Sequence, residues 1–222
     1  MAERDGFKQA AAGRALELVE RGMVLGLGSG TTARFFIQGL RGMRVAAVAT
    51  SRASAELARA AGVEVLDDPH VPIDLAVDGA DEIDAELRLV KGRGGALFRE
   101  KMVAMAARRF VVVADSSKLV DRLGRTYVPV EVAPFLWRRT AERLAGLGAS
   151  WSLRGGEEAP YVTDNGNLVL DLRYPGGIAE PDAAAAALKA VTGVLEHGLF
   201  LGLARAAFVA GATGVQVLGS PD

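Results

Sequence analysis

The stretch KGRGGALFRE, residues 91–100, brings a lysine, three glycines and a glutamate close together along the chain. We expect a glycine-rich loop after Lys91 and a helix over residues 96–108. At 100° per residue, Glu100 falls within an inward stripe formed by Ala96, Leu97, Val103, Ala104 and Ala107. Burying a carboxylate costs free energy unless the group is paired or has a functional role. Burial would raise the pKa of Glu100 toward the range of a general base. A structural ion pair with Lys101 or an arginine is the alternative.

A second candidate segment is DLAVDGADEID, residues 74–84, where an apolar strand ends at Asp78, Gly79, Ala80 and Asp81. Carboxylates beyond the carboxyl end of a strand lie where open α/β sheets bind ligands. Solvated turns and helix caps are the commoner explanation of such clusters. The oxygens could also bind Mg²⁺, with candidate ligands Asp78, Asp81, Glu82 and Asp84. A transition-metal site is disfavoured, because the chain has no cysteine and its two histidines, His70 and His197, are far apart.

The third candidate is the glycine loop GLGSGTTARF, residues 26–35, which follows an apolar run. A dinucleotide-binding loop would need a third glycine where Thr31 stands and an acidic residue about 20 positions later, and both are missing. A triphosphate-binding loop would need a lysine after the glycines. What remains is a strand-to-helix turn rich in N–H and hydroxyl groups, which suits a single anionic group. A purely structural turn is the alternative.

The elements that must position these residues follow from the hydrophobic periodicity. Apolar runs predict strands over residues 23–27, 45–49, 63–66, 73–77, 87–90 and 110–115, and helices over 32–40, 53–61 and 96–108. This alternation predicts a parallel sheet with helices on both faces. The last of these helices has a second apolar side, with Phe98, Met102 and Met105, which predicts that it is covered on both sides.

The pattern changes after Pro129. We expect helices over residues 134–147 and 181–191, and a hairpin at Asn165-Gly166 between two β-rich runs. AAFVAG and GVQVLG near the end of the chain read as two further strands. This part therefore predicts a smaller α+β domain.

Composition excludes several classes of function. The chain has 222 residues, 26 basic against 27 acidic side chains and no basic run, so neither nucleic acid nor a membrane surface is expected as a partner. The absence of cysteine excludes disulfides and thiol nucleophiles. No apolar stretch is long enough for a membrane span and the N-terminus does not look like a signal peptide, so we expect a cytoplasmic protein.

Five stretches together resemble a known family. GLGSGTT, DGADEID, KGRGGALFREK, VVVADSSK and VTDNGN occur in the order and spacing of type A ribose-5-phosphate isomerase. The resemblance implies a Rossmann-like, mostly parallel sheet with helices on both faces, at residues 1–127 and 199–222, with a smaller inserted α+β domain at 128–198. It also implies a homodimer or homotetramer that interconverts D-ribose 5-phosphate and D-ribulose 5-phosphate, in the non-oxidative branch of the pentose phosphate pathway, without a metal or organic cofactor.

The resemblance carries the family's substrate-binding positions onto this chain at three segments and two lysines: Ser29, Gly30, Thr31 and Thr32; Asp78, Gly79, Ala80 and Asp81; Lys91, Gly92, Arg93 and Gly94; and Lys118 and Lys8. Arg93 is a departure, because the family often has glycine at that position. The match gives Glu100 the role of proton acceptor.

Aldose–ketose isomerisation moves a proton between C2 and C1 through an enediol(ate), which requires a base and a donor to the developing oxyanion. On the strength of the resemblance we expect Glu100 to be the base and Lys91 the oxyanion stabiliser. Asp81 would assist ring opening and proton transfer at O1 or O4, and Asp78 would hold or share that role. The alternative is a non-catalytic sugar-phosphate-sensing domain, for which we expect a preceding DNA-binding segment and no need of Glu100 together with Lys91.

Overall fold

The computed structural model describes residues 2–221 and divides into two compact units. The first unit takes in the described residues up to Ala80, then Arg99–Lys118, and the described residues from Gly202 onward. The second unit consists of Asp81–Phe98 and Leu119–Leu201. This division assigns residues 81–98, 119–127 and 199–201 to the second unit, whereas the sequence placed them in the first.

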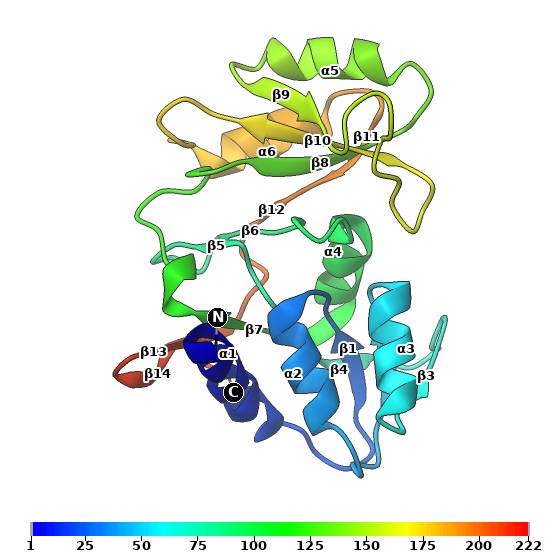
Figure 1. The fold of residues 1–222 in the computed structure, drawn as a ribbon, viewed down its shortest axis with the longest axis vertical. Coiled ribbons are helices and arrows are strands. Elements are labelled where there is room, and N and C mark those ends of the chain that lie inside the picture. The colour runs from blue at the N-terminus through cyan, green and yellow to red at the C-terminus, as the bar shows by residue number, and fades with distance from the viewer. Residues whose placement is uncertain (1, 222) are drawn as a thin grey trace. The chain divides into compact units, whose positions relative to one another are not determined.

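The first unit is built on a seven-stranded sheet with the order β14-β13-β7-β4-β1-β2-β3 (Figure 1). Its strands are β1 (Val24–Leu27), β2 (Ala46–Ala49), β3 (Glu64–Val65), β4 (Ile73–Asp78), β7 (Ala107–Asp115), β13 (Ala206–Gly211) and β14 (Gly214–Gly219). All neighbouring strands pair in parallel except β13 and β14, which form an antiparallel hairpin. The predicted fold class, a mostly parallel α/β sheet, is confirmed.

Helices pack on both faces of this sheet because successive strand residues point to opposite sides. Leu25, Leu75 and Val111 lie in one core with side chains of α1 (Ala2–Leu16) and α2 (Thr31–Gly39), against which Leu57 of α3 (Arg52–Ala60) also packs. The opposite face receives α4 (Leu97–Ala106): a Cβ on Gly26 would overlap Val103 of that helix. Gly26 therefore lets α4 lie close against β1.

The second unit contains a four-stranded antiparallel sheet with the order β11-β8-β10-β9. Its strands are β8 (Val128–Val132), β9 (Ser150–Leu153), β10 (Leu168–Arg173) and β11 (Val194–His197), and α5 (Trp137–Ala145) and α6 (Pro181–Lys189) contribute to its core. Val130 and Leu170 belong to that core, whereas the alternate positions Glu131 and Asp171 point to the other face. A three-stranded sheet of β5 (Glu82–Ile83), β6 (Leu89–Val90) and β12 (Leu199–Phe200) completes the unit.

Three predicted details are wrong. The helix expected over residues 96–108 ends at Ala106, because residues from Ala107 onward pair with β4 as the nine-residue strand β7. Met102 and Met105 are exposed in the described chain, so this helix is not covered on both sides. Asn165-Gly166 does form a turn, but the run before it makes a single bridge, between Val162 and Leu168, while β10 pairs with β8 and β9.

The helices of the described residues are all too short or too polar to cross a membrane.

Candidate active site

The carboxyl ends of β1, β4 and β7 form one edge of the first unit's sheet, because parallel strands end on the same side. Ser29 follows β1, Asp78 ends β4, and Lys118 follows β7 in a short 3₁₀ turn (Ser116–Lys118). The N-terminus of α2, with Thr31 and Thr32, comes directly after the β1 loop. This edge thus collects predicted residues from three separate segments of the sequence, at the place where open α/β sheets bind ligands.

Asp78 is buried, with 4 % of its surface exposed, and its carboxylate is bonded to the neighbouring main chain. Its Oδ1 accepts hydrogen bonds from the Ser29 N–H at 3.0 Å and the Gly79 N–H at 2.7 Å. A Cβ on Gly28 would overlap this carboxylate, so only glycine allows β1 to pass so close. Asp78 therefore fixes the glycine loop to the end of β4, which is a holding role.

A cluster of hydroxyl groups supports Ser29, and sequence reasoning missed it. The Ser29 Oγ lies 2.8 Å from Thr50 Oγ1 and 2.8 Å from Ser51 Oγ, and Ser54 Oγ donates to the Gly28 carbonyl at 2.7 Å. These residues follow β2, which pairs in parallel with β1. The available signal was the run of hydroxyl residues immediately after the strand predicted over 45–49.

The N-terminus of α2 has the features of an anion site. Its capping residue is Gly30, at φ +94°, so no side chain occupies the first amides of this nine-residue helix. Thr31 is exposed and Thr32 is buried, which presents one hydroxyl outward. Exposed N–H groups at a helix N-terminus, together with the helix dipole, favour an anionic group.

Glu100 lies in the first turn of α4 and is buried, as predicted, with 5 % of its surface exposed. Val103, three residues later on the same helix face, packs against β1 at Gly26. Because α4 leads without a loop into β7, the helix runs opposite to the strands, and its ten residues rise about 15 Å. The first turn of α4 therefore lies toward the carboxyl edge of the sheet, the edge that carries Ser29 and Asp78.

The two lysines of the first unit that were predicted to bind substrate have different surroundings. Lys118 is half-buried at the carboxyl edge. Lys8 lies on α1, where its Nζ is 3.3 Å from Asp5 Oδ1. The described contacts of Lys8 do not link it to the other predicted site residues.

The second unit holds the other predicted residues, Asp81 and the loop Lys91–Gly94. Lys91 is buried, its N–H donates to the Gly198 carbonyl at 2.8 Å, and its Nζ lies 5.4 Å from the centre of the Phe200 ring. Gly92 has φ +105° and its carbonyl accepts from the Gly95 N–H at 2.9 Å, which closes a tight turn. A side chain at Gly92 would be strained in this conformation.

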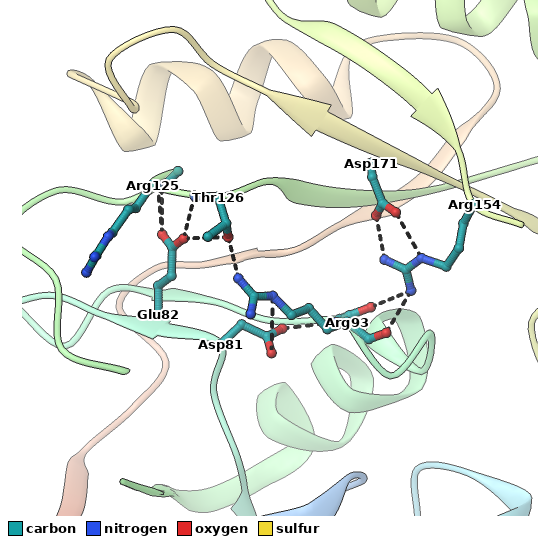
Figure 2. A network of polar contacts seen from close by, with 9 residues as sticks. Asp81, Glu82, Arg93, Arg125, Thr126, Arg154 and Asp171 are labelled. Carbon is teal, nitrogen blue, oxygen red and sulfur yellow. Dashed lines mark hydrogen bonds and ion pairs between the residues drawn. The ribbon is translucent and has the colours of Figure 1, made fainter. Parts of the chain in front are cut away.

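A charged network surrounds this loop (Figure 2). Asp81 Oδ2 accepts from the Arg93 N–H at 3.0 Å, and the Arg93 guanidinium donates to the Thr126 hydroxyl. Glu82 accepts four hydrogen bonds, from the amides of Gly124, Arg125 and Thr126 and from the Thr126 hydroxyl. Arg93 therefore has a defined place beside Asp81.

The carboxylates of residues 78–84 are directed to separate partners. Asp84 accepts from the Glu86 and Arg88 amides and from Arg88 Nε at 2.7 Å, and this bond raises the pKa of Arg88 above its ordinary value. Among residues 2–221, no three histidine, aspartate or glutamate side chains are grouped so that they could hold a metal ion. The acidic turn therefore has the geometry of structural and positioning contacts.

The family model and the sequence relatives of this chain indicate the same family. The sequence model of the family ribose 5-phosphate isomerase A (phosphoriboisomerase A) matches residues 46–214. Ribose-5-phosphate isomerase A of Roseiflexus castenholzii is 50% identical over 97% of this chain and 96% of its own.

Solved structures agree. Ribose 5 phosphate isomerase A from Neisseria gonorrhoeae superposes with a TM-score of 0.93 and 34% identity, covering 100% of this chain and 99% of its own. A D-ribose-5-phosphate isomerase in complex with phospho-erythronic acid has a TM-score of 0.93 and 37% identity, over 97% and 99% of the two chains. The chain belongs to the ribose-5-phosphate isomerase A family.

Proposed function

We propose that this chain interconverts D-ribose 5-phosphate and D-ribulose 5-phosphate, with Glu100 as the base that moves the proton. Family membership supports the reaction. The observation that supports the role is a carboxylate buried in the first turn of α4, on the face that packs against β1. Because its relatives are named as isomerases, we do not adopt the alternative of a non-catalytic sensor.

In the proposed mechanism the open-chain aldose loses its C2 proton to the Glu100 carboxylate. The electron pair of the C–H bond forms the C1–C2 double bond, and the carbonyl oxygen O1 takes up the negative charge of an enediolate. Glu100, now protonated, returns the proton to C1 while the O2 proton is transferred to O1, so that the C2 carbonyl forms and O1 becomes a hydroxyl. A positioned base of this kind contributes about 10²- to 10⁴-fold to the rate.

The proposed roles of Lys91 and Asp81 rest on the family resemblance. The Lys91 ammonium stabilises the developing oxyanion, which is the electrostatic part of the catalysis. Asp81, held by the Arg93 amide, assists ring opening and proton transfer between the oxygens. Asp78, whose carboxylate is bonded to the Ser29 and Gly79 amides, holds the glycine loop in place.

The phosphate is assigned to Ser29, Thr31, Thr32 and Lys118. The uncapped N-terminus of α2 supports this assignment, because its amides and dipole attract a dianion. Anchoring the distant phosphate would orient C1 and C2 at the base. A sugar acid phosphate such as phospho-erythronic acid, which a solved relative binds, has the same phosphate and an anionic end, and we expect it to compete with substrate.

The direct test is to follow the conversion of ribose 5-phosphate by proton NMR, in H₂O and in D₂O. We expect the wild-type enzyme to isomerise the sugar and, in D₂O, to incorporate deuterium at the carbon that receives the transferred proton. Glu100→Gln should abolish both the isomerisation and this incorporation. A purified, folded chain that leaves ribose 5-phosphate unchanged would overturn the proposed reaction. An active enzyme whose Glu100→Gln variant retains its activity would overturn the assignment of the base alone.

We also propose that the enzyme works as a cytoplasmic homodimer or homotetramer without a metal or organic cofactor. Multi-angle light scattering would decide the oligomeric state.

A further inference from the structure

Arg154, which follows β9 in the second unit, donates hydrogen bonds to two different parts of that unit (Figure 2). Its Nη1 donates to the carbonyl oxygens of Gly92 and Arg93, each at 3.0 Å. Its Nε and Nη2 donate to the two carboxylate oxygens of Asp171 on β10. One planar side chain thus connects the strand β10 to the main chain of the lysine loop.

The loop depends on such an external contact because it has little regular structure of its own. Residues 91–96 lie between β6 and α4, and Gly92 and Gly95 both have positive φ. Glycine-rich backbone costs the most entropy to hold in one conformation. Arg154, which bonds both carbonyls, lowers the number of conformations that the loop can adopt.

The guanidinium of Arg154 is itself held in place by Asp171. The side chains of Arg154 and Asp171 are 15 % and 12 % exposed, and the ion pair is a two-point, charge-assisted contact. Because the guanidinium is planar, its orientation toward Asp171 also fixes where Nη1 points. Asp171 in turn belongs to β10, which pairs with both β8 and β9.

We infer that Arg154 is a positioning residue for the isomerisation and that Asp171 orients it. It acts through the main chain of Gly92 and Arg93 and thereby fixes Lys91, the proposed oxyanion stabiliser. The inference rests on the proposed function. A small displacement of a catalytic group lowers the rate strongly, since a shift of about 1 Å can reduce it about 100-fold.

The test compares Arg154→Lys, Arg154→Ala and Asp171→Asn with the control Arg173→Ala. Lysine keeps a charge beside Asp171 but cannot serve both the carboxylate and the two carbonyls. Arg173 is the matched control because its guanidinium lies 5.4 Å from the centre of the Tyr127 ring, against 6.0 Å for Arg154, and because Arg173 is exposed. We expect kcat to fall about 10-fold in Arg154→Lys and about 100-fold in Arg154→Ala, with KM changed less than about 3-fold, since the phosphate is assigned to other residues. Arg173→Ala is expected to behave as wild type.

A double-mutant cycle separates positioning from general stability. If Arg154 acts through Lys91, introducing Arg154→Ala into the Lys91→Ala variant should lower its residual kcat by less than about 3-fold, because the group to be positioned is gone. Additive losses would overturn the inference. The activity of the wild type and its loss in Glu100→Gln are measured in parallel, so that failure of the proposed function is recognised separately.

Hydrogen exchange gives a readout that does not depend on activity. We expect the amides of residues 92–96 to exchange faster in Arg154→Lys, with the amides of β1, β4 and β7 unchanged. Should Arg154→Ala fail to fold, the exchange and kcat of Arg154→Lys decide the matter. Wild-type exchange in this loop, or a wild-type kcat in Arg154→Lys, would overturn the inference.

Discussion

The two units hold their site residues by different physical means. In the first unit, Ser29 and Asp78 are fixed by strand ends, main-chain amides and hydroxyl groups, with Gly28 allowing close approach. In the second unit, the Lys91 loop is fixed by the Asp81 carboxylate, which accepts from the Arg93 amide, and by the Arg154 guanidinium. A parallel sheet provides a rigid edge whose geometry tolerates little added volume, whereas an irregular loop needs directional side-chain contacts and has room for an added methyl group only at some positions, such as Gly94.

Glu100→Gln should have the largest effect, because it removes the basic oxygen while keeping the shape of the side chain. We expect kcat to fall about 10²- to 10⁴-fold, with little change in KM or thermal stability. Glu56→Gln, an exposed glutamate of α3, is the control in the same unit. A folded Glu100→Gln enzyme within a few-fold of wild-type kcat would make Asp81 the leading candidate for the base.

Gly28→Ala tests how closely the first unit is packed. The added Cβ overlaps Asp78, and overpacking of this kind costs about 1–3 kcal/mol. We expect a lower midpoint of thermal unfolding and reduced activity. The matched change in the second unit is Gly94→Ala, where a Cβ meets nothing within 4 Å, and it should leave the midpoint unchanged. Equal effects of the two substitutions would remove the contrast between the regions.

Lys118→Ala should weaken binding of phosphorylated ligands about 10- to 100-fold, the range for losing one bond to a charged group. The affinity for inorganic phosphate, used as a competitor, should fall in parallel with the affinity for ribose 5-phosphate, because both ligands depend on the same lysine. Lys189→Ala, which removes an exposed lysine paired with Glu196 in the second unit, is the control. If ribose and ribose 5-phosphate lost affinity equally, Lys118 would not be a phosphate ligand.

Metal removal should have the smallest effect. Because the acidic side chains of residues 78–84 are engaged with amides and arginines, we expect dialysis against EDTA to leave the isomerase rate unchanged. Loss of activity that Mg²⁺ or Mn²⁺ restores would show that the acidic turn binds a metal.

The sequence by itself determined the features that depend on local spacing. The helical period predicted that Glu100 is buried, and the apolar runs predicted the strands of the parallel sheet. A residue's face on a helix or strand follows from a period of 3.6 or 2, which is a property of the segment alone. The order of five short motifs was specific enough to identify the family.

Only the tertiary structure decided which distant segments meet. Ser29 contacts the hydroxyls of Thr50 and Ser51 because β1 and β2 pair in one register, and Arg154 reaches Gly92 across 62 positions of sequence. The end of α4 at Ala106 likewise follows from the pairing of β7 with β4. Hydrophobic periodicity sets which side of an element is buried, but register and partner depend on the packing of segments that are far apart in the chain.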